Sequence, residues 1–244
     1  MGKLFEWSRF FENIPKILPY LTVTFSIVFY ATIFGVLLAV FIVLIQIKKI
    51  RVLYQISKVY ISFMRGTPML VQLMLIYYGL PAIIDPLLGT SINRDWSAVV
   101  FAYVTYILNQ GAFLSVIFYS AVTSIPYGQT EAGLSVGLTH YQTFIRIILP
   151  QMIRVALPPF GSDLVGLFQG SSLVFLIGVT DIMGRAKTIG SATKHVLEAY
   201  VFDVIIYIII SLAVRLLFWY LNKRLDYTNG RKTGGKEGIP WIST

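Results

Sequence analysis

Two long runs without a charged side chain constrain this chain more than any other feature. Residues 17–47 and 96–130 contain no Asp, Glu, Lys or Arg. Each run is longer than the roughly 20 apolar residues that cross a bilayer as one helix. The composition agrees, because 56% of the 244 residues are hydrophobic and 13% are charged, against about 25% charged residues in soluble domains. The chain is therefore predicted to be an integral membrane protein.

The remaining apolar segments extend this prediction to five membrane-spanning helices. Backbone polar groups must pair within the segment itself inside a bilayer, so apolar runs of this length indicate an all-α, polytopic fold. The spans are expected at about residues 17–47, 67–84, 97–120, 157–178 and 199–221. We expect an interfacial segment at 1–19, a transmembrane domain at 20–225 and a mobile, basic, cytoplasmic tail at 226–244.

The distribution of Lys and Arg predicts the orientation of these spans. Loops rich in Lys and Arg stay in the cytoplasm. Twelve of the 20 Lys and Arg residues fall in 48–65, in the connection that ends near Arg154 and in the tail, and seven fall in the alternate segments. The bias predicts the N-terminus outside and the C-terminus in the cytoplasm. The net charge of +9 is thus explained by loop orientation, and no nucleic-acid partner is expected.

The polar connection 131–150 lies between two apolar runs but has the pattern of a helix. Its apolar residues recur at three- and four-residue steps, which indicates one or two short amphipathic helices. We expect the helical stretch to open at Glu131, to bend at Gly137 and to end at Pro150. Long ordered connections of this kind are usually functional, although an ordinary interfacial helix is the plainer alternative.

This connection resembles the coupling loop of ABC importer permeases. That family has Glu-Ala-Ala, a Gly four residues after the last Ala, and then Ile-x-Leu-Pro. The corresponding residues here are Glu131, Ala132, Gly133, Gly137, Ile147, Leu149 and Pro150, and only Gly133 departs from the pattern. Four further segments look like the polar amino-acid uptake branch of these permeases: 65–68, 71–81, 124–133 and 148–159.

The resemblance implies a type I ABC importer permease fold in a bacterial inner or plasma membrane. It implies uptake by a homo- or heterodimer of permease copies in the lipid bilayer. An ABC ATPase subunit carrying ATP and Mg would bind the coupling helix, and an extracytoplasmic substrate-binding protein would deliver the cargo. The chain itself would be a transport subunit and not an enzyme.

The sequence contains no chemistry of its own that could replace this ATPase. Residues 230–236 match the first seven positions of a phosphate-binding P-loop, but Glu237 stands where Ser or Thr must hold magnesium. No Ser/His/Asp set, carboxylate pair or metal-ligating cluster has catalytic spacing. The chain has no Cys, and its two histidines, His140 and His195, lie far apart. We expect no catalytic residue, metal or cofactor in this chain.

Polar residues inside the third and fourth spans predict the substrate path. Side-chain amides at mid-membrane depth are costly unless they are paired, and they usually face the bundle interior or a water-filled path. A small-residue face on the fourth span would let a ligand or a neighbouring backbone approach closely. The expected path residues are Asn109, Gln110, Phe113, Val116, Gln169, Gly170 and Ser171.

The chain departs from the resembled family at the positions that would carry charge in this path. Many relatives have Glu where Val116 stands and Arg where Tyr119 stands, and many have Lys-Asp-Thr-Ser-Leu where residues 169–173 read Gln-Gly-Ser-Ser-Leu. A neutral polar amino acid or cystine therefore fits better than a substrate with a charged side chain. The copy could also be the non-binding half of a heterodimer.

Two other functions compete with this interpretation. A self-contained secondary transporter or channel would want an intramembrane acidic relay or an inverted repeat, and the sequence displays neither. A membrane anchor or sensor would not need polar groups in the middle of its spans.

Overall fold

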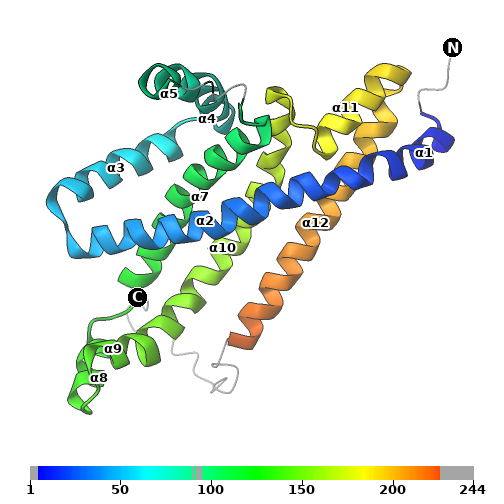
Figure 1. Cartoon of the computed structure of the whole chain (residues 1–244). Helices are drawn as coiled ribbons and strands as arrows, with labels where there is room; N and C mark the ends of the chain where they lie inside the picture. Colours follow the sequence, from blue (N-terminus) through cyan, green and yellow to red (C-terminus); the bar gives the residue numbers. More distant parts are fainter. Residues whose placement is uncertain (1–4, 90, 92–94, 226–244) are drawn as a thin grey trace, which may run out of the picture.

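Five helical segments of the computed structural model are long and apolar enough to cross a membrane, which confirms the predicted number of spans and the all-α fold (Figure 1). The structure describes residues 5–89, 91 and 95–225, and no β-strand occurs among them. The five segments are Trp7–Lys48, Met69–Leu87, Ala98–Thr123, His140–Ile177 and Val196–Leu225.

The first half of the bundle contains two long helices and a crossing made of several pieces. Its elements are α1 (Trp7–Ile17), η1 (Leu18–Tyr20), α2 (Leu21–Lys48), α3 (Arg51–Gly66), α4 (Met69–Met74), the π-helical η2 (Leu75–Gly79), α5 (Leu80–Leu88) and α7 (Ala98–Thr123). The second half continues with α8 (Gly128–Ser135), α9 (His140–Thr143), the π-helical η3 (Phe144–Ile148), α10 (Leu149–Ser171), η4 (Ser172–Ile177), α11 (Ile182–Thr193) and α12 (Val196–Leu225).

Helices α2 and α7 pack at the centre because small residues let them approach. Ala31 and Ala39 are fully buried on α2. A Cβ atom on Gly35 would lie 2.9 Å from Gln110, and one on Gly111 would lie 2.5 Å from Leu38. Real Cβ atoms do not approach so closely, so a larger residue at either position would force the neighbouring side chain to move. The predicted small-residue stripe of the first span therefore serves close helix packing.

We call α3 together with the second apolar segment, Met69–Leu87, the second crossing. The chain is broken where α3 ends, and this differs from the prediction. Residues 48–65 were expected to be a basic cytoplasmic segment, but 51–66 form α3, which runs beside the middle of α7. The Tyr60 hydroxyl donates to the backbone carbonyl of Leu108 there. The chain breaks at Thr67 and Pro68, where the backbone is extended, and then resumes as α4. A proline lacks the N–H that would continue α3, so the break follows from the sequence.

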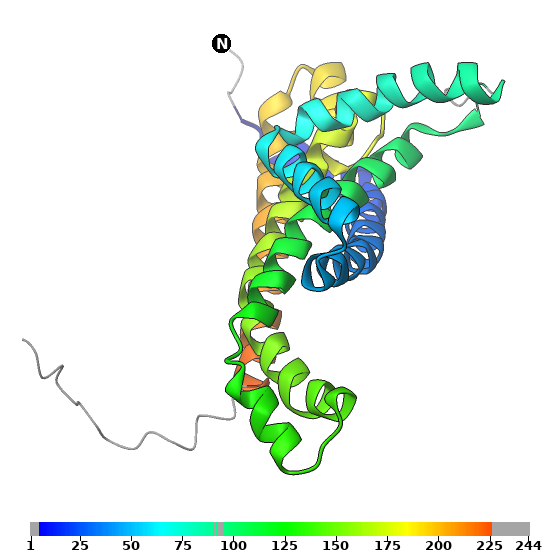
Figure 2. The same cartoon turned by 90° about the vertical axis from the view of Figure 1, so that its left-hand side faces the viewer.

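The connection 131–150 folds into a hairpin of two short helices, α8 and α9, which extends beyond the end of α12 in both views (Figures 1 and 2). The bend lies at Gly137, whose φ of +83° is in the left-handed region. Helix α8 begins at Gly128, so Glu131 lies in its first turn and does not open it. A capping box, in which Thr139 and Gln142 bond each other's backbone, starts α9.

Pro150 does not end the helix, which corrects the sequence prediction. The helix continues without interruption from His140 to Ile177. In an ordinary α-helix the proline ring meets the carbonyl group four residues earlier. Here the five residues before Leu149 form the wider π-turn η3, which moves that carbonyl and makes room for the ring. The helix that contains the fourth span consequently begins well before the predicted start at about residue 157.

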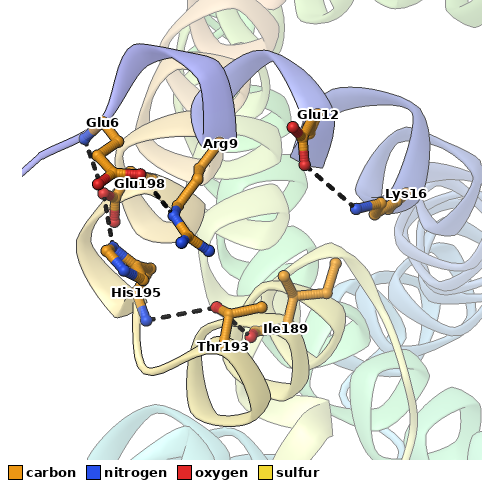
Figure 3. A network of polar contacts seen from close by, with 8 residues as sticks. All are labelled: Glu6, Arg9, Glu12, Lys16, Ile189, Thr193, His195 and Glu198. Carbon is orange, nitrogen blue, oxygen red and sulfur yellow. Dashed lines mark hydrogen bonds and ion pairs between the residues drawn. The ribbon is translucent and has the colours of Figure 1, made fainter.

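The amphipathic helix α1 is attached to the start of α12 by a buried carboxylate (Figure 3). Glu198 is fully buried and accepts a hydrogen bond of 2.9 Å from the backbone N–H of Glu6. The Nδ1 atom of His195 lies 3.1 Å from the same carboxylate oxygen, and Arg9 pairs with the Glu6 side chain. These contacts fix α1 against the corner between α11 and α12.

Candidate functional site

The two amides predicted to lie in the path are paired with other side chains. The Asn109 amide donates to the Oε1 atom of Gln72, at 2.8 Å, and so joins α7 to α4. The Gln110 amide donates to Asp163 on α10, and Gln110 is only 2% exposed. Both residues lie at the centre of the bundle, as expected, but protein groups satisfy them without a ligand.

Gln72 also ties the two halves of the broken second crossing. Its amide nitrogen donates to the Met64 carbonyl at 2.7 Å and to the Thr67 carbonyl at 3.0 Å. The last carbonyl groups of any helix lack a partner within it. Gln72 therefore caps the end of α3 with the same amide group that receives Asn109.

Arg65 is the residue of this region that the sequence interpretation did not select. Its guanidinium lies over the ring of Phe113, with 5.5 Å between the central carbon and the ring centroid. It is also close enough to Asp163 for electrostatic attraction. A signal existed, because the cation directly precedes a Gly-Thr-Pro break, and helix breaks inside a span often carry ligand contacts.

Val116 lines a cavity of about 250 Å³ between α3 and α7, together with Lys58 and Tyr119. The nitrogen of Lys58 lies 4.4 Å from the centroid of the Tyr54 ring, in the same cavity. The cavity beside position 116 thus holds a cation from the neighbouring helix and no carboxylate among its lining residues.

The α10 residues of the predicted path lie in another place. Gln169 and Ser172 line a cavity of about 610 Å³ whose other wall is α12, with Asp203, Tyr207 and Arg215. The Gly170 carbonyl accepts a hydrogen bond of 2.5 Å from the Tyr106 hydroxyl on α7. Ser171 is buried and donates to Phe168 within its own helix. Of the predicted path residues, Val116 and Gln169 therefore line two different cavities.

The small-residue face of the fourth span is open. A Cβ atom at Gly166 or Gly170 would meet nothing within 4 Å, whereas one at Gly161 would meet the Phe218 ring at 2.6 Å. Ser162 is exposed on the same face. Within the described residues, Gly161 is the glycine of α10 that serves close packing with α12.

The predicted coupling residues gather on the α8–α9 hairpin and the helix that follows. Gly133 is buried because α9 crosses it, and a Cβ atom there would lie 2.6 Å from the Thr143 side chain. Glu131, Ala132 and Pro150 are exposed, and Ile147 and Leu149 are partly buried. The hairpin also exposes three large apolar side chains, with 72% exposure at Tyr127, 76% at Val136 and 74% at Tyr141.

The described residues hold no group of three or more His, Cys, Asp or Glu side chains arranged to bind a metal ion. Asp181, which caps α11 with a 2.8 Å bond from the Gly184 N–H, lies outside the spans. Burial raises the pKa of Asp181 to about 6, although the bond from Gly184 opposes this shift. The P-loop look-alike at 230–236 falls outside the described residues.

Comparisons with known proteins agree on one group. Residues 31–227 match the family described as binding-protein-dependent transport system inner membrane component. The chain is 36% identical over 231 residues to the L-cystine transport system permease protein TcyL of Bacillus subtilis (strain 168), covering 95% of this chain and 96% of that protein. It is 32% identical over 220 residues to the arginine transport system permease protein ArtQ of the same organism, covering 90% and 97%.

A solved structure shares the fold. The crystal structure of an amino acid ABC transporter with histidines superposes with a TM-score of 0.78 at 28% identity, covering 90% of this chain and 99% of that chain. The two named relatives carry different amino acids at similar identity, so overall similarity does not select one substrate.

Proposed function

This chain belongs to the family of binding-protein-dependent transport system inner membrane components, and we propose that it is the permease subunit of an ATP-driven amino-acid importer. In this role it forms the translocation path with a second permease copy. A separate ABC ATPase subunit binds and hydrolyses ATP with Mg, and an extracytoplasmic binding protein supplies the amino acid. The relatives named as amino-acid permeases support this assignment.

The α8–α9 hairpin is the observation that carries the proposal. It projects from the bundle (Figure 2) and exposes Tyr127, Val136 and Tyr141. Exposed apolar side chains gathered on a projecting element mark an interaction site. A short helical element with such anchors fits into a groove on a partner. We assign this hairpin as the element that binds the ATPase.

The substrate we propose is a neutral polar amino acid or cystine. Val116 and Gly170 provide no charge where a charged side chain would need a partner. The cations near the α7 wall, Arg65 and Lys58, come instead from α3. They suit the carboxylate that every amino acid carries, and they repel a cationic side chain.

The coupling role is tested by Val136→Glu in the complete transporter. Val136 is 76% exposed, so the change should leave the permease folded, while a buried unpaired charge in the groove should prevent docking. We expect the ATPase to be lost on co-purification in detergent. Val136→Thr, which keeps the shape of the side chain, is the matched control and should retain it. Normal ATPase association and uptake by the Glu variant would refute the assignment.

The energy source is tested with proteoliposomes that contain wild-type protein. Uptake should require both the ATPase subunit and ATP. Accumulation by this chain alone under a sodium or proton gradient would establish the secondary transporter instead.

The substrate class is tested by Val116→Glu combined with Gly170→Asp. Competitive uptake of neutral against basic amino acids should shift toward the basic ones. Because Lys58 shares the cavity with Val116, we expect a smaller shift from the Glu change alone than from the pair. An active double variant with unchanged preference would place selectivity in the external binding protein.

A further inference from the structure

The carboxylate of Asp203 is buried and has no partner within the described residues. Asp203 is 3% exposed, on the third turn of α12. Neither of its oxygen atoms accepts a hydrogen bond. Native structures rarely leave a buried carboxylate in this condition, because removal from water is costly unless a cation or several donors replace it. A protonated carboxyl group would still leave its O–H without an acceptor.

Within the described part of the chain, the groups around Asp203 also lack hydrogen-bond partners or cations that could stabilise its carboxylate. Asp181 is fully buried, is near enough for electrostatic interaction with Asp203, and leaves its own Oδ2 atom without a partner. The hydroxyl of Tyr207, one turn along α12, makes no hydrogen bond of good geometry within the described residues, although Ser171 and Ser172 lie near it. Arg185 and Lys187, the cations within α11, are engaged with aromatic rings: Arg185 lies over the Tyr20 ring and Lys187 over the Phe175 ring.

Asp203 opens onto the 610 Å³ cavity between α10 and α12. A volume of this size is within the range of small-ligand sites, roughly 300–1,000 Å³. Gln169, Ser172 and Ser211 add hydrogen-bonding groups to its wall. Arg215 lines the same cavity, but it lies twelve residues from Asp203 on one helix, which is about 18 Å along the axis. Arg215 is therefore too far away to pair with Asp203, and a cationic group of a molecule in the cavity can reach the carboxylate instead.

We propose that Asp203 binds the primary ammonium group of the transported amino acid, as a specificity-determining residue at the α11 end of the path. This inference rests on the proposed function, because it takes the cargo to be an amino acid. It adds α12 to a path that the sequence placed on the third and fourth spans. The ammonium supplies a cation and three N–H donors, which match the two unpartnered oxygens of Asp203 and the Tyr207 hydroxyl.

The first test uses wild-type protein and therefore does not depend on the folding of a variant. Uptake by the reconstituted transporter first identifies which of L-cystine, L-glutamine and L-serine is transported fastest. Binding of that radiolabelled amino acid to the purified permease–ATPase complex is then measured without the binding protein. The Nα-acetyl derivative of that amino acid lacks the ammonium and should compete at least about 30-fold more weakly than the parent. The carboxamide derivative keeps the ammonium and should lose less. Equal competition by the acetyl derivative would overturn the inference.

The second test changes the residue. Asp203→Asn should weaken binding by about 30-fold or more, the loss typical of removing one partner of a buried charge pair. Asp203→Glu, which keeps the charge, should retain most of the affinity. Leu216→Ala, at an exposed position of α12 outside the cavity lining, is the control. Unchanged affinity in the folded Asn variant would refute a role for Asp203. Wild-type transporter that takes up none of the three amino acids would contradict the proposed function itself, which separates the two failures.

Discussion

Gln72 offers the sharpest test of how the broken second crossing is held together. We consider Gln72→Met, which keeps the length and volume of the side chain but removes its amide. Gln72 is 2% exposed, so water cannot replace the lost bonds without a rearrangement. The Met64 and Thr67 carbonyls lose their donor, and the Asn109 amide loses its acceptor.

The expected loss of stability is moderate. Hydrogen bonds between membrane helices contribute about 0.6 kcal/mol on average and up to about 1.7 kcal/mol, while each buried group left unpaired costs about 1–3 kcal/mol. With three groups affected and partial relaxation, we expect the free energy of unfolding to fall by about 2–4 kcal/mol. A double-mutant cycle with Asn109→Ala should give a coupling energy of about 0.6–1.7 kcal/mol for the pair.

The assay is reversible unfolding of the purified chain in mixed micelles, followed by circular dichroism. The control is Val71→Ala on the same helix, α4, since Val71 is 52% exposed and its side chain makes no hydrogen bond. A loss below about 0.5 kcal/mol for Gln72→Met, or a coupling energy near zero, would show that the end of α3 does not depend on this amide.

Three further changes follow from single residues. Gly137→Val should lower uptake strongly without lowering membrane insertion. A β-branched residue at a φ of +83° costs at least about 1–2 kcal/mol and reshapes the hairpin. Normal uptake by this variant would argue against a fixed bend. Glu198→Gln should lower the free energy of unfolding by about 1–3 kcal/mol, because the pair with His195 is weakened. Proteolysis of α1 should also become faster. An unchanged rate of proteolysis would contradict the attachment of α1 through Glu198. Because burial raises the folded-state pKa of Asp181 to about 6 from an ordinary 3.8, the folded state favours the protonated form. Its contribution to stability should thus be present below about pH 4 and decline by up to about 3 kcal/mol as the pH rises to about 6. Asp181→Asn should flatten this part of the pH profile, and an unchanged profile would refute the assignment.

The fold was predictable from sequence because membrane spans depend on length and hydropathy, which are local properties. The third span was expected at 97–120 and is found at Ala98–Thr123. The errors fall where a local rule was overridden. Pro150 reads as a helix stop, but the π-turn before it accommodates the ring. The basic segment 48–65 reads as a loop, but its amphipathic face packs against α7 as α3.

The site was less predictable because polar groups pair across helices. Asn109 and Gln110 were correctly expected to face the interior, yet the sequence could not show that Gln72 and Asp163 satisfy them. Conversely, Asp203 looked like an ordinary charge near the end of a span. Only the packing of α10, α11 and α12 reveals that its carboxylate is buried on a cavity wall, with no hydrogen-bond partner among the residues that the structure describes.

The uninterrupted helix from His140 to Ile177 has a mechanical consequence. It contains 38 residues, so it is about 57 Å long, with the α8–α9 hairpin at one end and Ser172 near the other. A rod of that length converts a rotation of about 5° at its base into a displacement of about 5 Å at its tip. A small angular movement imposed on α9 is thus magnified into a movement of about the thickness of an amino-acid side chain beside the Asp203 cavity. The two prolines within α10, Pro158 and Pro159, lie near its midpoint, where a pivot would divide the motion between the two halves.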